Sequence, residues 1–494
     1  MYLFDGVLGS VTRTSAVRPA GAGERLSPLD SLLLYVEDAA DVPVLGAALL
    51  RVAGRPGYDD VLSHVEGRLG GLPRFGQRIA DVPFEGARPV WVEDARFDLR
   101  HHVRHIGLPE GGGETALKAL VARLLAERLE RSRPLWDLIL VDGHADDRCA
   151  LVLRLHHALS DGVAGVSILQ SLFGDVVSPG AAGTAGAPVG APSSVDLLAG
   201  ALLERASEAL QLPGVLWRSA RAPRRLAARV RGVGELARAL GTRAGGSPLN
   251  VPVGSLRRFE FVDADLDECR RAAARLGGTV NDLVLTVVAA ALGRLFRARG
   301  LAPADLELTA LVPVSMRSEA EPAAPGNRFA GVFAPLPIAI DDPHEQFAAV
   351  HTAMRRLKRG HQSSGGDLLV ALGGLAPPIV LRATAHLLLR HRAFNLIVSN
   401  VRGPQGPLAI AGHAVEGLTP VLPLLANQTL GVAVMSSDGM IGFGLLGDGE
   451  AMADLGLLAE ALGESITTLV APRRSPRVRR TRRSCVLHSA GPER

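Results

Sequence analysis

The sequence predicts an α/β protein of two domains. Stretches with helical spacing of apolar residues alternate with short apolar runs, typical of buried strands, in both halves of the chain, and such alternation is typical of α/β folds. At 494 residues the chain is too long for a single compact core. A Gly/Ala/Pro/Ser-rich stretch at 178–194 separates the halves, as expected of a flexible connection between domains.

These boundaries divide the chain into five parts. We expect an irregular extension, a first domain, a linker, a second domain and a disordered basic tail, at 1–24, 25–178, 179–247, 248–470 and 471–494.

Composition limits the class of protein. The chain is 47% hydrophobic and 4% aromatic, which favours a globular protein. Its three cysteines, Cys149, Cys269 and Cys485, are too few and too scattered for a disulfide framework or a zinc site. We therefore expect no metal and a reducing, cytoplasmic environment. Asp5 stands where a signal peptide would carry basic residues, so no signal peptide is expected.

Two arginine-rich segments lie outside the predicted domains. Residues 218–243 carry eight arginines interleaved with apolar residues, and a basic amphipathic helix favours either a membrane surface or a solvated helix across the domains. Residues 472–494 carry eight arginines and one Glu. We expect this tail either to bind anionic lipid or to be solvated without a partner. Nucleic acid is not expected, because no aromatic residues are interleaved.

Membrane contact is expected to be peripheral. The longest uncharged candidate span, 417–437, contains Pro420, Pro423, Asn427 and Gln428, which is unfavourable for a helix that faces lipid.

The first half begins with a capped helix and continues through strands. Ser27 and Asp30 both precede an apolar segment at 32–36, and either can cap a helix that begins there. After this helix we expect strands at 44–52, 138–141 and 149–155, a helix at 58–69 and an amphipathic helix at 115–130.

The chemistry is expected where the strand at 149–155 ends. His156 and His157 follow that strand directly, and Asp161 and Gly162 lead into an apolar helix. Because consecutive strand residues point to opposite faces, only one of the two imidazoles can face a given cavity. A neutral imidazole can take a proton from a hydroxyl. Asp161 can orient an imidazole or hold a basic residue, and Gly162 lets the turn close without a Cβ clash.

In the second half, the long helix that runs to Phe296 begins near Asn281 and Asp282. A helix N-terminus offers oriented N–H groups, so both residues are candidates either for a cap or for a substrate contact. Trp136, before the strand at 138–141, is a candidate either for core packing or for a place near the substrate. The other elements expected are strands at 259–262, 308–314, 394–398 and 430–435 and a helix at 266–276.

Several stretches together resemble one family. His156-His157-x-x-x-Asp161-Gly162 resembles the HHxxxDG motif of CoA-dependent acyltransferases. The stretches PRF.QR, WVEDARFDLRHHVRH, SRPLW and LSPLDSLLLYVED, with the ND pair, are similar to the bacterial wax ester synthase/diacylglycerol acyltransferase family over about 26–469. The chain departs from that family's pattern at Arg402, where proline is usual, and at Ser437, where tyrosine is common.

The resemblance implies two similar domains of the chloramphenicol-acetyltransferase-like fold with a channel between them. It implies His157 as general base, Asp161 in a structural role paired with an arginine, and acyl-CoA as co-substrate without a further cofactor. The acceptor would be diacylglycerol or a long-chain fatty alcohol, at the inner membrane face or a lipid droplet. Another hydroxyl lipid or polyketide acceptor, or an inactive lipid-binding protein, stays open. The absence of a G-x-S-x-G elbow argues against a serine hydrolase.

Overall fold

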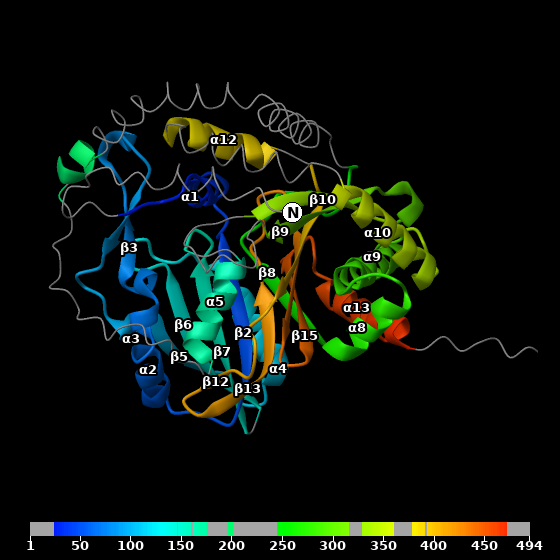
Figure 1. The fold of residues 1–494 in the computed structure, drawn as a ribbon, viewed down its shortest axis with the longest axis horizontal. Helices are drawn as coiled ribbons and strands as arrows, with labels where there is room; N and C mark the ends of the chain where they lie inside the picture. Colours follow the sequence, from blue (N-terminus) through cyan, green and yellow to red (C-terminus); the bar gives the residue numbers. More distant parts are fainter. Residues whose placement is uncertain are drawn as a thin grey trace, which may run out of the picture.

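The computed structural model describes residues 24–145, 147–159, 162–174, 193, 195–200, 245–315, 329–359, 378–390 and 393–471. These residues form a mixed α/β structure built on two six-stranded sheets (Figure 1), which confirms the predicted fold class. The basic helix expected at 218–243 and nearly all of the N-terminal extension and the tail lie outside the described residues.

The first sheet carries the strand that ends at the histidine pair. Its order is β12-β13-β2-β7-β6-β5, with β5 parallel to β6 and the other neighbours antiparallel. Apolar residues of α2 and α5 pack on one face, and those of α4 pack on the other. The bounds are β2 Leu45–Ala53, β5 Val103–Gly107, β6 Trp136–Ala145, β7 Arg148–His156, β12 Ala409–Ile410, β13 His413–Val421, α2 Tyr58–Glu66, α4 Gly113–Ala126 and α5 Gly162–Phe173.

The second sheet, of order β10-β9-β11-β14-β15-β8, is covered by helices α8, α9, α10 and α13. Helix α9 is almost wholly buried in this core. The bounds are β8 Arg257–Asp265, β9 Leu308–Ser315, β10 Phe329–Leu336, β11 Leu396–Arg402, β14 Leu430–Ser437, β15 Met440–Asp448, α8 Leu266–Arg275, α9 Val280–Ala298, α10 Pro343–Arg359 and α13 Leu455–Val470.

Smaller elements complete the described part of the chain. Strands β1, β4 and β3 form a three-stranded sheet, and α12, from the second half, packs on α1, from the first (Figure 1). Their bounds are β1 Glu24–Arg25, β3 Gln77–Ala80, β4 Val90–Glu93, α1 Pro28–Ala40, α3 Leu99–His102 and α12 Pro378–Arg390.

Strand β13 links the two halves. It comes from the second half of the chain, yet it pairs antiparallel with β2 and so extends the first sheet. The second domain predicted at 248–470 therefore contributes strands to the sheet of the first. Glycines let β13 lie close against the second sheet, because a Cβ at Gly442 or Gly444 of β15 would clash with the carbonyl oxygen of Leu418 or Pro420 of β13.

A shared apolar core and ion pairs join the sheets. Ile139 and Val152 of the first sheet belong to the same buried cluster as Phe259 and Leu446 of the second. At its edge, Arg51 of β2 contacts Asp263 of β8 at 2.5 Å.

Most of the predicted elements are present, with shifted ends. Ser27 caps α1, since its Oγ accepts the Asp30 N–H at 3.1 Å. The strand expected at 394–398 is instead Leu396–Arg402, because the ladder continues through polar residues that an apolar pattern does not detect.

Within the described ranges, no single helix is long and apolar enough to cross a membrane. Only when taken together are helices α8 and α9 long and apolar enough to span a membrane, and the pair is bent by 94° at the break between them.

The close approach of β13 and β15 gives a stability prediction. Gly444→Ala should lower the free energy of unfolding by about 1–3 kcal/mol, because the clash is with backbone that must move. The control is Gly456→Ala in α13, where the nearest atom lies 4.0 Å from the added Cβ and alanine favours the helix. Thermal unfolding of both variants tests this, and equal midpoints would contradict it.

Candidate active site

His156 is the last residue of β7 and is held on both ring nitrogens. Its Nδ1 accepts the N–H of Ala158 at 3.0 Å, so in the neutral ring the proton is on Nε2. Nε2 lies 3.3 Å from Oε2 of Glu37, a close polar contact rather than an aligned hydrogen bond. The residue is 1% exposed. Both ring nitrogens of His156 therefore face groups of the protein, and the ring is closed off from solvent.

His157 follows the strand and is half-buried. Its backbone N–H donates to the carbonyl oxygen of Val44 at 3.0 Å, which places it where β2 begins and β7 has just ended. Gly162, as predicted, stands where the chain enters α5. Asp161 lies outside the described residues, and its role stays a prediction.

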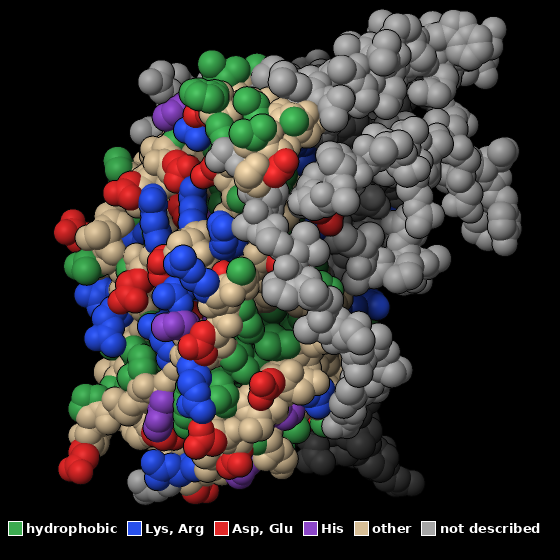
Figure 2. Space-filling view, turned by 90° about the vertical axis from the view of Figure 1, so that its left-hand side faces the viewer, with side chains coloured by type: hydrophobic (Ala, Val, Ile, Leu, Met, Phe, Trp, Pro, Cys, Tyr) green, Lys and Arg blue, Asp and Glu red, His purple; other side chains and the backbone are tan. Residues whose placement is uncertain are grey.

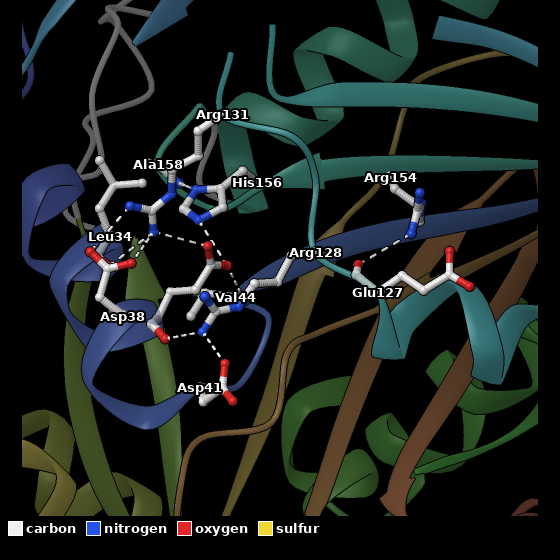
Figure 3. A network of polar contacts seen from close by, with 11 residues as sticks. Leu34, Asp38, Asp41, Val44, Glu127, Arg128, Arg131, Arg154, His156 and Ala158 are labelled. Carbon is white, nitrogen blue, oxygen red and sulfur yellow. Dashed lines mark hydrogen bonds and ion pairs between the residues drawn. The ribbon is translucent and has the colours of Figure 1, made fainter. Parts of the chain in front are cut away.

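A buried carboxylate in α1 faces His156. Oε2 of Glu37 also accepts the N–H of Val44 at 2.9 Å, and Oε1 accepts from the Arg131 guanidinium at 3.0 Å. Arg131 and His156, both labelled in Figure 3, each contact this carboxylate. Burial alone would raise the pKa of Glu37, but the contacts with His156, Val44 and Arg131 outweigh it and lower the pKa to about 2.

A second buried pair stabilises the same strand. Arg154 of β7 is 3% exposed and binds both oxygens of Asp137, at 2.8 and 2.5 Å. It also donates to the carbonyl oxygens of Leu124 and Glu127 at the end of α4, which complements the negative end of that helix. The pair fixes β7 against α4 just before the histidines.

Helix α5, which follows the motif, is fixed at its far end. His64 of α2 contacts the Leu172 carbonyl oxygen at 2.8 Å, and Arg68 donates to those of Ser171 and Gly174. These are carbonyls that a helix end leaves without a partner.

The ND pair has two different environments. Asp282 is buried, completes a capping box with Thr279 and contacts Nδ1 of His351 at 2.9 Å. Its carboxylate therefore serves the start of α9. Asn281 is half-buried, and its Oδ1 accepts from Nδ2 of Asn400 on β11 at 3.4 Å.

Trp136 is a core residue. It is 1% exposed, its Nε1 donates to the Phe75 carbonyl oxygen at 2.9 Å, and its ring stacks on His102 at 4.7 Å. Of its two candidate roles, the structure supports core packing.

Sequence reasoning missed the buried charges. Glu37 directly follows the apolar run 32–36, and Arg154 lies inside the run 149–155. A charged residue in such a run needs a buried partner, and that signal was available for both. The partners, Arg131 and Asp137, are distant in sequence and carry no comparable signal.

In the described part of the chain, no group of three or more His, Cys, Asp or Glu residues could hold a metal ion.

The fold and the histidine pair define a class of protein. The starter condensation domain of rhizomide synthetase, solved with C8-CoA, aligns with a TM-score of 0.56 at 15% identity, covering 92% of this chain and 96% of that one. A wax ester synthase/diacylglycerol acyltransferase from Marinobacter aquaeolei VT8 aligns at 0.63 and 24% identity, covering 90% and 98%. The fold is that of the chloramphenicol-acetyltransferase-like acyltransferases.

The chain belongs to the wax ester synthase/diacylglycerol acyltransferase family. The family's catalytic domain matches residues 26–284, and its C-terminal domain matches 325–470. A probable diacylglycerol O-acyltransferase of Mycobacterium tuberculosis is 32% identical over 92% of this chain and 98% of its own. A putative one from the same species is 31% identical, over 91% and 90%. The predicted family is confirmed, and with it an acyltransferase enzyme.

The lowered pKa of Glu37 predicts a pH-dependent contribution to stability. Because the folded pKa, about 2, is below the ordinary 4.5, the ionised carboxylate stabilises the fold fully above pH 4.5, and this stabilisation is lost as the pH falls from 4.5 through 2. Glu37→Gln should therefore be less stable than wild type at pH 7, by about 3 kcal/mol, and the gap should narrow towards pH 3. Denaturant unfolding tests this, and a gap independent of pH would contradict it.

Proposed function

We propose that this protein transfers a long-chain acyl group from acyl-CoA to the hydroxyl of diacylglycerol or of a long-chain fatty alcohol, with His157 as general base. Family membership supports the reaction, and the names of the mycobacterial relatives support diacylglycerol as acceptor.

One observation supports His157 rather than His156 as the general base. The two nitrogens of His156 are directed at Ala158 and Glu37, and the ring is buried. A general base must reach the proton it removes. His157, half-buried at the end of the strand, is the member of the pair that a substrate can approach.

In the proposed reaction the imidazole of His157 takes the proton of the acceptor hydroxyl. The oxygen attacks the thioester carbonyl carbon, the C–O bond forms, and the C–S bond breaks. The imidazolium then gives its proton to the CoA thiolate, so that the products are an ester and free CoA. No acyl-enzyme and no cofactor beyond acyl-CoA are needed.

Asn281 is the proposed donor to the negatively charged oxygen of the intermediate. Because its Oδ1 accepts from Asn400, its Nδ2 is the group that it can present to an oxyanion. Val401, which follows Asn400 on β11, packs in the same cluster as α5. Because consecutive strand residues point to opposite faces, Val401 meets the α5 cluster on one side of β11 and Asn400 meets Asn281 of α9 on the other. The proposed channel between the domains would lie near this end of β11.

Thiol release tests the proposed base. Purified protein is offered palmitoyl-CoA with hexadecanol or dioleoylglycerol. His157→Ala should lower acceptor-dependent release by about 10²–10⁴-fold, the usual contribution of a general base. The control, His101→Ala, removes an exposed histidine and should leave the rate unchanged.

Release that survives in the His157 variant would remove this residue from the mechanism. Wild-type protein that is inactive with both acceptors would favour another hydroxyl lipid or polyketide, or a lipid-binding protein without activity.

We also propose that the protein is cytoplasmic and works at a lipid surface, the inner membrane face or a lipid droplet. Phe84 is 94% exposed and Ile379 is 69% exposed, and large exposed apolar groups that gather mark interaction sites. Glu85 contacts Arg382 at 3.2 Å, which ties the Phe84 turn to α12, where Ile379 lies one turn earlier. Figure 2 shows hydrophobic side chains gathered at the top of the molecule, the end where α12 lies in Figure 1.

Backbone geometry favours a functional reason for this exposure. Phe84 and Glu85 have φ of 56° and 52°, and a bulky residue in this region is strained. Leu198, in the helical residues 195–200, packs against Gly86 of this turn, while the Phe84 side chain is exposed to solvent.

Vesicle binding tests the lipid surface. Phe84→Ser with Ile379→Ser should reduce co-sedimentation with phosphatidylglycerol vesicles severalfold, since each loses an apolar side chain that lipid would bury. The control, Leu457→Ser on α13, removes a 50% exposed leucine on the helical side of the second sheet. Equal binding by all three proteins would contradict this surface.

A further inference from the structure

Glu37 is connected to His157 by two short paths. In the first, Oε2 of Glu37 accepts the Val44 N–H at 2.9 Å, and the Val44 carbonyl oxygen accepts the His157 N–H at 3.0 Å. In the second, Glu37 faces Nε2 of His156, and Nδ1 of His156 accepts the Ala158 N–H at 3.0 Å. The N–H groups of His157 and of the next residue are thus both bound to groups that Glu37 contacts.

The second path depends on the protonation of His156. A carboxylate can only accept, so it favours the imidazole with its proton on Nε2. The opposite tautomer would set Nδ1–H against the Ala158 N–H and break that contact. Glu37 thereby selects the form of His156 that holds the turn after the strand.

The carboxylate itself is fixed. It is 2% exposed, and Arg131 binds its Oε1 at 3.0 Å, while Oε2 faces His156 and Val44. The backbone carbonyl of Glu37 accepts from Arg128 at 2.6 Å, so the end of α1 is fixed as well (Figure 3). Neighbouring Asp38 shares Arg131, at 2.8 Å, but is 38% exposed and has no contact with His156 or Val44 among those of the described residues.

We propose that Glu37 is a positioning residue for the catalytic histidine: it holds Val44 and the Nε2–H form of His156, and thereby fixes the backbone of His157. This inference deepens the proposed function, since it concerns the same site. A misplacement of a catalytic group by about 1 Å can cost about 10²-fold in rate.

Three substitutions separate position from charge. Glu37→Gln can place its amide oxygen where Oε2 lies and keep both paths. Glu37→Asp keeps the charge but withdraws the carboxylate by one methylene from Val44 and His156. Glu37→Leu removes both contacts. Asp38→Asn is the matched control, on the same helix and with the same arginine.

We expect kcat for thiol release to fall about 10²-fold in Glu37→Leu and about 10-fold or more in Glu37→Asp, while Glu37→Gln stays within about fivefold of wild type. The KM for palmitoyl-CoA should change less than about twofold in each, because only the position of the base is altered. Asp38→Asn should match wild type. All are assayed at a temperature at which circular dichroism shows them folded, and Glu37→Asp serves if Glu37→Leu does not fold.

A spectroscopic readout is independent of activity. In protein labelled with ¹⁵N-histidine, the ring signals of His156, assigned with His156→Gln, should show the Nε2–H tautomer in wild type and Glu37→Gln. They should lose it in Glu37→Asp.

The proposal is overturned if Glu37→Asp is as active as wild type and better than Glu37→Gln, which would show that charge rather than position matters. It is also overturned if His156 keeps one tautomer in every variant. Wild-type protein without acyl transfer would instead refute the proposed function, and the histidine spectra would then decide on the positioning role alone.

Discussion

The arrangement of the two halves depends on an exchange between the sheets, because β12 and β13 of the second half extend the first sheet. Strand β13 belongs to the second half of the chain but pairs with β2 of the first sheet, while β14 and β15, which follow it, return to the second sheet. The exchange is compatible with close packing because glycines on β15 admit the backbone of β13. It sets the second sheet beside the first and lets β11 pack near α5.

Within that frame, the region of the histidine pair is held by buried charges rather than by apolar packing alone. Arg154 and Asp137 fix β7 to α4, and Glu37 with Arg131 fixes its end to α1. Buried ion pairs are weak contributors to net stability, yet loss of one partner is costly. Their value here lies in defining one geometry for the turn that carries His157, the proposed general base.

The proposed lipid surface lies on the side of the first domain where α1, α12 and the Phe84 turn meet. A cavity of about 480 Å³ lies beside them, lined by residues of α1, β3 and α12 together with Arg131, and its lining includes Tyr35, Ile79 and Arg382. Arg131 is also the partner of Glu37. The region where lipid is proposed to bind is thus continuous with the network that holds the histidine turn.

The sequence by itself determined the α/β class, most of the helices and strands, the family and the position of the histidine pair. These follow from local signals, such as apolar periodicity, a helix cap at Ser27 or Asp30 and the short motif at 156–162. It did not decide which candidates were structural: Trp136 and Asp282 are engaged in core packing and a helix cap. Only the tertiary structure revealed the exchange of β13, the pairing of Asn281 with Asn400 and the partners of Glu37 and Arg154. The physical reason is that strand pairing and the neutralisation of buried charge join residues far apart in the chain, and a partner at such a distance leaves no mark in the local pattern.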